Sequence, residues 1–205
     1  MTSGMEVRTI DSADGEIGVP TERLCRVMEL AIANKPLEET LSELIRIVET
    51  TSRTGVLGSI LLLDGRHLRH GAAPSLPKDY SEAIDGAEIG PIAGSCGTAA
   101  FRGRPVFVSD IATDPLWAEF KTVALPHGLR ACWSTPIITG GSKVLGTFAM
   151  YHREPREATV RDLVLVDLVT HTAALVIDRK HAQEPWPARP NRPHPHNRRG
   201  SAHTP

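Results

Sequence analysis

Apolar residues recur at helical spacing near both ends of the chain. Residues 21–31, 37–48 and 159–181 each carry an apolar residue every three or four positions, a pattern that places these residues on one face of a helix. Thr159 is followed three positions later by Asp162, a variant of the capping box that begins helices. The pattern therefore predicts two consecutive helices at the start of the chain and one long helix near its end.

Short apolar runs bounded by turn residues fill the centre of the chain and predict β-strands. Asp64-Gly65 and Thr139–Ser142 are turn sequences that would join neighbouring strands as hairpins. Hairpins with helices before and after them indicate an α+β fold with an antiparallel sheet. The predicted strands cover residues 59–63, 67–73, 104–110, 130–138 and 144–151, and helical pieces are expected at 78–84, 95–101 and from Asp114-Pro115 to about Ala124.

The composition excludes several classes of function. The sequence has 205 residues, a formal net charge of −1 and no apolar run near the ~20 residues that cross a bilayer. A charge so close to zero gives no field that would attract nucleic acid or an anionic membrane. Three cysteines and the lack of a signal-peptide start predict a cytoplasmic protein. We therefore expect neither nucleic acid nor a membrane among its partners.

The two ends of the chain differ in composition from its centre. Residues 1–19 are polar and lack periodicity, which predicts a flexible leader. Residues 183–205 are rich in proline, histidine and arginine and predict a disordered tail. A single domain over residues 20–182 accounts for the rest of the sequence.

The sequence offers little that would hold a metal ion. His67 and His70 are three residues apart on a predicted strand, so they would face opposite sides of it and could not share a metal. No HExxH, CxxC or P-loop pattern occurs. We predict no metal site and leave the cofactor unknown.

The motif Gly94–Ala100, GSCGTAA, resembles a motif of GAF domains. Pro105-Val, Ser109-Asp-Ile and Leu145-Gly-Thr-Phe follow it in the order of that family, and the likeness extends over residues 20–180. The stretches DIATDPLW and HGLRACWSTPI are similar to GAF modules of bacterial sensor proteins.

The resemblance implies a GAF-like antiparallel sheet of about six strands with the terminal helices on one face. A ligand pocket would lie on the other face, under a roof formed by residues 74–103 and 111–129. It further implies a sensory or signalling module without catalytic activity, which binds an unidentified small molecule. Its partner would be a histidine kinase or another signalling protein. No kinase, cyclase or DNA-binding sequence follows Lys180, so we expect either a stand-alone module or a truncated sensor.

The long helix near the end of the chain also predicts a homodimer. Its apolar positions cover more of the helix surface than one core face needs. We expect the terminal helices to form the interface, with the helix at 159–181 facing residues 22–49 of a second copy. A protein that only dimerises or binds other proteins, without a ligand, is an alternative function.

The candidate ligand site combines aromatic faces with a few polar groups, as small-molecule pockets do. An arginine in such a pocket suits a carboxylate or phosphate. The alternative is that the two tryptophans fill the core and that Arg130 pairs with Asp110 or Asp114. The candidate ligand-binding residues are Cys96, Thr98, Asp110, Trp117, His127, Arg130 and Trp133.

A cysteine-based reductase is the second alternative function. The turn at Ser95–Ala99 is similar to a cysteine turn of free methionine-R-sulfoxide reductases, and a helix start can lower the pKa of Cys96. The partner cysteines of that family are missing from residues 85–89 and 112–120, and Cys132 falls on a predicted strand. Cys132 is followed by tryptophan where a bilin-binding stretch would have histidine, and the lone His127 before a glycine is more typical of a helix end than of a haem ligand. We therefore predict that the protein is not an enzyme.

Overall fold

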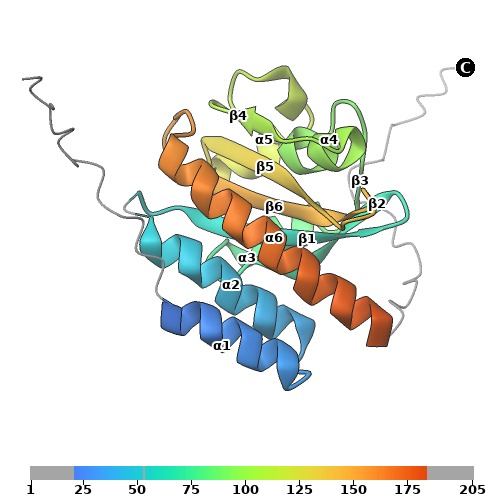
Figure 1. Ribbon diagram of the computed structural model, residues 1–205. Coiled ribbons are helices and arrows are strands. Elements are labelled where there is room, and N and C mark those ends of the chain that lie inside the picture. The colour runs from blue at the N-terminus through green and yellow to red at the C-terminus, as the bar shows by residue number, and fades with distance from the viewer. Residues whose placement is uncertain (1–20, 53, 184–205) are drawn as a thin grey trace, which may run out of the picture.

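Six antiparallel strands form the centre of the molecule, with helices on both sides of the sheet (Figure 1). The computed structural model describes residues 21–52 and 54–183. The strands are arranged in the order β3-β2-β1-β6-β5-β4, and every neighbouring pair is antiparallel. This confirms the predicted α+β class. The strands are β1 Leu57–Asp64, β2 His67–Ala72, β3 Ala87–Glu88, β4 Val106–Val108, β5 Ala131–Ile138 and β6 Val144–His152.

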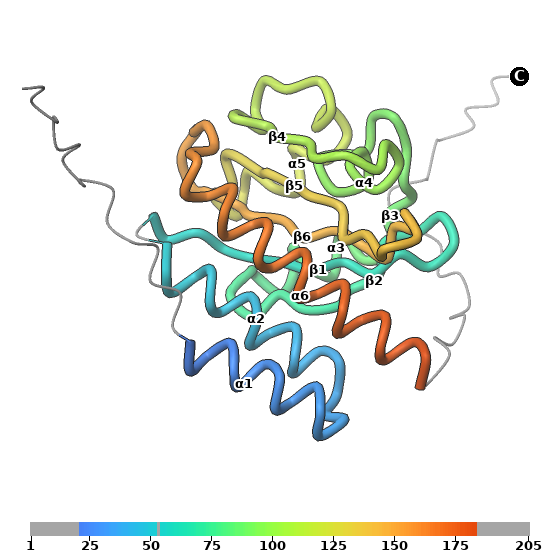
Figure 2. The backbone as a smooth tube through the Cα atoms, viewed as in Figure 1, coloured from blue at the N-terminus to red at the C-terminus, as the bar shows by residue number. Residues whose placement is uncertain are grey.

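Three helices from the two ends of the described chain lie on one face of the sheet. They are α1 (Thr21–Ile32), α2 (Leu37–Thr51) and α6 (Val160–Gln183). Helix α2 packs against β1, β2 and α6, while α1 packs on α2 as an outer layer (Figure 2). The terminal helices therefore cover one face, as the family resemblance implied.

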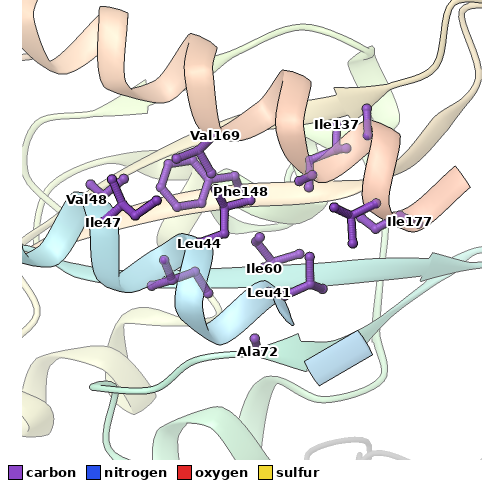
Figure 3. Close-up of a cluster of buried hydrophobic side chains, with 14 of the residues drawn as sticks. Leu41, Leu44, Ile47, Val48, Ile60, Ala72, Ile137, Phe148, Val169 and Ile177 are labelled. Carbon is purple, nitrogen blue, oxygen red and sulfur yellow. The ribbon is translucent and has the colours of Figure 1, made fainter. Parts of the chain in front are cut away.

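The core between these helices and the sheet is made of interlocking aliphatic side chains and one phenylalanine. Phe148 of β6 and Ile60 of β1 point toward α2 and α6, where they meet Leu44 and Val169 (Figure 3). All four are at most 1% exposed. Burying such side chains is the main favourable contribution to folding, at about 1.5–3 kcal/mol each.

Helix α6 begins at the capping box that the sequence predicts. The Thr159 hydroxyl donates to Asp162 Oδ2 at 2.7 Å, and the Asp162 amide donates back to the Thr159 hydroxyl at 3.3 Å. Arg156 adds a charged hydrogen bond to the same carboxylate at 2.9 Å. Free N–H groups at a helix start need such partners, so these contacts fix where α6 begins.

The opposite face of the sheet is covered by short helices, which we call the roof. In place of one continuous helix from 115 to 124, residues 115–127 form three short helices, because the amides of Trp117, Ala118 and Phe120 donate to carbonyls three positions back and tighten the chain. Trp117 is thereby turned inward and buried. The roof helices are α3 Lys78–Ile84, α4 Gly94–Arg102, η1 Pro115–Trp117, α5 Lys121–Ala124 and η2 Leu125–His127.

The first hairpin turn differs from its prediction by one residue. Asp64 pairs with His67 in the sheet, so the two turn residues are Gly65 and Arg66. The predicted leader 1–19, and the predicted tail 183–205 apart from Gln183, lie outside the described residues. Within the described ranges, no helix has the length and apolarity needed to cross a membrane.

Candidate functional site

Strand β5 separates the two cores of the molecule residue by residue. Successive strand residues point to opposite faces of a sheet. Cys132 accordingly belongs to the buried cluster under the roof, whereas Trp133 belongs to the cluster under α2 and α6. On the neighbouring strand, Tyr151 lies opposite Cys132 and shares its face.

Small residues let the start of α4 lie directly on the sheet. Gly94 has φ +61°, a left-handed conformation that favours glycine, and it directs the chain into the helix. Ser95 and Cys96 in the first turn are buried, and the Ser95 hydroxyl donates to the Cys132 carbonyl oxygen at 2.9 Å. The sequence GSCG thus places the Cys96 thiol close to the sheet, in the buried cluster under the roof.

Between α4, η1 and the sheet lies a small cavity of about 30 Å³, which we call the inner cavity. Trp117 closes one side of it and is held by a hydrogen bond from its indole N–H to the Ser95 hydroxyl at 3.0 Å. Aromatic rings form much of its wall, and Tyr80 meets Tyr151 edge-on. The lining residues are Leu61, Leu68, Tyr80, Ile84, Ala87, Ala93, Gly94, Ser95, Cys96, Gly97, Trp117, Phe120 and Tyr151.

A larger groove of about 500 Å³, the outer groove, lies beside the inner cavity. Ile84, Ala87, Ala93 and Phe120 line both spaces, so the groove and the cavity share a wall. An ion pair between Arg66 Nε and Glu88 Oε1 at 2.8 Å stands at its edge. The groove is lined by Arg66, Ala83, Ile84, Ala87, Glu88, Ile89, Gly90, Pro91, Ile92, Ala93, Glu119, Phe120 and Val123.

The Cys96 thiol has an unusual electrostatic environment for a buried cysteine. Neighbouring hydrogen-bonding groups, first Cys132 and then Ser134, Tyr151 and Thr147, lower the pKa of Cys96 to about 7 despite its burial. Burial raises the pKa of Cys132, so that thiol stays protonated. Burial likewise raises the pKa of Tyr151, which keeps its hydroxyl hydrogen available as a donor. The site thus pairs a readily ionised thiol with a neutral one.

Two of the sequence-predicted site residues line the inner cavity, namely Cys96 and Trp117. Thr98 is fully buried, and its hydroxyl accepts from the Ala93 amide at 3.0 Å, so it caps the start of α4. Its polar atom therefore serves the local backbone.

Asp110 and Arg130 pair with each other at the edge of the roof. Arg130 donates to both carboxylate oxygens, at 3.2 and 3.4 Å. The Ala112 amide, followed in strength by Arg130, keeps the pKa of Asp110 low. This ion pair ties the loop after β4 to the start of β5, and neither residue lines the cavity or the groove.

His127 and Trp133 also lie outside both spaces. The His127 ring meets the edge of Tyr80, with ring centroids 5.9 Å apart, and so supports the cavity wall from behind. Trp133 faces the helices, where it packs on His152 with centroids 4.3 Å apart and lies under the Arg156 guanidinium. Trp117 and Trp133 therefore lie on opposite faces of the sheet.

The sequence-based prediction missed most of the aromatic and apolar cavity wall. Tyr80 sits on a short helix whose orientation no sequence pattern gives. Tyr151 could have been placed, since the period of two along β6 puts it with Thr147 and Ala149 on one face. Phe120 lines the cavity because the helix predicted from residue 115 to 124 is interrupted at this point, which the sequence pattern did not indicate. Among residues 21–52 and 54–183, no group of three His, Cys, Asp or Glu side chains is placed to hold a metal ion.

Comparison with known proteins identifies the fold. A family model of the GAF domain matches residues 34–178. A methyl sulfide methyltransferase-associated sensor of Methanosarcina acetivorans is 36% identical over 161 residues. The match covers 78% of this chain and 16% of that protein, so the chain spans about a sixth of the length of this relative.

Solved structures agree with this comparison at the level of the fold. The GAF domain of an Acinetobacter phosphoenolpyruvate-protein phosphotransferase superposes with a TM-score of 0.61 at 16% identity, covering 80% of this chain and 95% of that one. Free methionine-R-sulfoxide reductase from Neisseria meningitidis, in complex with its substrate, gives a TM-score of 0.62 at 14% identity, covering 84% and 96%. The GAF domain of a phosphotransferase and a reductase therefore share this architecture.

Proposed function

The chain belongs to the GAF domain family, and we propose that it is a sensory module that binds a small organic molecule between its roof and its sheet. Family membership and the sensor among its relatives support a sensory or signalling role. The ligand would bind in the outer groove, it would be small and mainly apolar, and its binding would be transmitted through helix α6.

The observation that carries the proposal is the wall that the outer groove shares with the inner cavity. The groove, at about 500 Å³, has the size of a small-molecule site. Four residues line both spaces, so a ligand in the groove could extend an apolar group toward the floor of the roof cluster. Apolar walls around a few polar groups are typical of ligand pockets.

The lining of the groove restricts the ligand class. Most of its side chains are apolar, and its charged residues are Arg66, Glu88 and Glu119. The Arg66 guanidinium lowers the pKa of Glu88 through their hydrogen bond. Opposite charges near an apolar groove suit a small, mainly apolar molecule that carries one hydrogen-bonding or charged group.

The route for the signal in this proposal is the outer face of α6. Val164 and Leu175 are 49% and 71% exposed, and with the half-buried Leu168 they lie on one face of α6 at heptad positions that also include the polar His171. Exposed apolar side chains at this spacing favour a second copy of the chain as the occupant. A ligand that shifts the roof would change the state of this homodimer and so reach a histidine kinase or another signalling partner.

A thermal-shift screen of small carboxylates, amines and nucleotides tests ligand binding, together with native mass spectrometry of protein purified from its own host. The Ala83→Trp variant fills the outer groove from α3, and Glu82→Trp adds the same side chain on the same helix away from it. A retained or stabilising ligand should be lost in Ala83→Trp and kept in Glu82→Trp. Finding no bound molecule and no stabilising compound would remove the ligand from the proposal.

Reduction of methionine-R-sulfoxide is a second candidate function, since Cys96 lines the inner cavity beside another thiol. A coupled assay with thioredoxin, thioredoxin reductase and NADPH measures it through the loss of NADPH absorbance. Turnover that disappears in Cys96→Ser would support the reductase, and an inactive wild-type protein would exclude it.

A further inference from the structure

Cys96 and Cys132 meet under the roof although they are far apart in sequence. Cys96 is in the first turn of α4, Cys132 is in the middle of the sheet, and a hydrogen bond joins Ser95 to the Cys132 carbonyl oxygen at 2.9 Å. Both side chains belong to the buried cluster under the roof, and each thiol shifts the pKa of the other. Tyr151, opposite Cys132 in the sheet, places its hydroxyl 3.8 Å from Cys96 Sγ. We call Cys96 and Cys132 the thiol pair.

Polar side chains surround the thiol pair where an aliphatic core would be expected. Ser134 and Thr147 are fully buried, and neither hydroxyl has a nitrogen or oxygen partner. Both hydroxyls lie close enough to Cys96 to lower its pKa. Burying a hydroxyl without a good partner costs about 1–3 kcal/mol of folding free energy. A cysteine that only fills the core would not need two such hydroxyls beside its sulfur.

This polar environment favours a thiolate on Cys96. Its pKa is lowered to about 7, so about half of the molecules carry the thiolate at neutral pH, and the thiolate is the nucleophilic form. Burial keeps Cys132 protonated until a nearby group removes its proton. The two cysteines therefore suit the roles of attacking and resolving thiol.

A small oxidant fits next to Cys96. Cys96 is 8% exposed as a residue and lines the inner cavity, whose 30 Å³ is enough for roughly two water-sized molecules. Hydrogen peroxide has that size. The outer groove lies directly beside this cavity, and only the side chains of Ile84, Ala87, Ala93 and Phe120, which line both, need to move to admit a small molecule.

We propose that the thiol pair is a peroxide-sensitive switch that closes to a disulfide between α4 and β5. The Cys96 thiolate attacks one peroxide oxygen and the O–O bond breaks. The departing hydroxide takes a proton and becomes water, which leaves a sulfenic acid on Cys96. Cys132 then loses its proton and attacks Cys96 Sγ; the S–O bond breaks, the S–S bond forms and a second water leaves. The two thiols supply both electrons, and any cellular dithiol reductant restores them.

The experiment titrates the purified full chain with hydrogen peroxide and counts alkylatable thiols after denaturation. Three free thiols should fall to one, with Cys25 remaining and a Cys96–Cys132 peptide that dithiothreitol separates. Cys25 is exposed on α1, so Cys25→Ser is the matched control, and its two thiols should both be lost at the wild-type rate. Loss of Cys25 with Cys96 and Cys132 unchanged, or oxidation of Cys96 without the crosslinked peptide, would overturn the proposal.

Two variants test the roles within the pair. Cys132→Ser should accumulate a sulfenic acid on Cys96 that dimedone traps, because no resolving thiol remains. Tyr151→Phe removes one hydrogen bond to the thiolate and should slow thiol loss about fivefold at pH 7 if the pKa of Cys96 rises by one unit. Unchanged kinetics in a folded Tyr151→Phe protein, or no trapped sulfenic acid in a folded Cys132→Ser protein, would contradict these roles. The titration of the wild-type protein tests the disulfide whether or not either variant folds.

Discussion

The Trp117 indole donates a hydrogen bond of 3.0 Å to the Ser95 hydroxyl, and both side chains are buried. This contact joins η1 to the start of α4, and Ser95 passes it on to the sheet through the Cys132 carbonyl oxygen. The roof is thus attached to the sheet by a short chain of hydrogen bonds next to the inner cavity.

Ser95→Ala should lower the free energy of unfolding by about 1–3 kcal/mol, because the buried Trp117 N–H loses its partner. Urea denaturation followed by circular dichroism measures the loss. In a Trp117→Phe background the same change should cost clearly less, since no indole N–H remains to be left unpaired. An equal cost in both backgrounds would show that the Trp117–Ser95 bond contributes nothing.

Leu175→Glu should convert the proposed homodimer to a monomer. The side chain is 71% exposed on the outer face of α6, so a charge there does not disturb the core but does prevent apolar contact with a second copy. Light scattering coupled to gel filtration measures the mass. Phe101→Glu, at a 48% exposed position on α4 on the other side of the sheet, is the control and should keep the wild-type mass. A monomeric wild type would refute the dimer.

Gly146→Ala should destabilise the protein by about 3 kcal/mol or more. A Cβ at this position in β6 would collide with the Leu61 carbonyl oxygen of β1, and backbone cannot move aside at the centre of a sheet. Gly140 has nothing within 4 Å of such a Cβ, so Gly140→Ala should stay within about 0.5 kcal/mol of wild type. Thermal melts compare the two variants, and similar melting temperatures would contradict the predicted crowding.

Stability should fall between pH 7 and pH 5 because of His152. Burial, followed by the nearby Arg156, lowers the pKa of this histidine to about 4, although Asp162 opposes the shift. Between about pH 4 and 6.5 the unfolded chain binds a proton here that the folded chain does not, so stability decreases as pH falls, by at most about 1.4 kcal/mol per pH unit.

Urea midpoints at several pH values should therefore show a flatter dependence in His152→Gln. The exposed His171 on α6 provides the matched variant, His171→Gln, which should keep the wild-type slope. Equal slopes in wild type and His152→Gln would mean that the burial of this ring has no effect on its protonation.

The sequence was sufficient for the elements that depend on local patterns. The helical stripe at 37–48, the Thr159–Asp162 cap and the hairpin of β5 and β6 all follow from spacing within a few residues. The break at Phe120 was missed because Pro115 after Asp114 is a strong helix start, and propensity does not show that Trp117 gains more by turning toward Ser95.

The candidate site was harder to predict because it depends on which side of a strand a residue faces. Trp117 and Trp133 are both large and apolar, but Trp133 lies under α6 because of the face of β5 that it occupies, and Trp117 lies under the roof because η1 turns it toward Ser95. The approach of Cys96 to Cys132 depends on how α4 lies across β5, which no local pattern contains.

Cys132 and Trp133 are consecutive residues that belong to different cores. A disturbance at Cys132 is therefore one peptide bond away from Trp133, which contacts His152 and Arg156, and Arg156 holds the first turn of α6 through Asp162. The oxidation of Cys132 and the resulting movement at the start of α6 would be separated only by the thickness of strand β5. A shift of the β5 backbone by a fraction of an ångström would reach the start of α6 without any long relay of side chains.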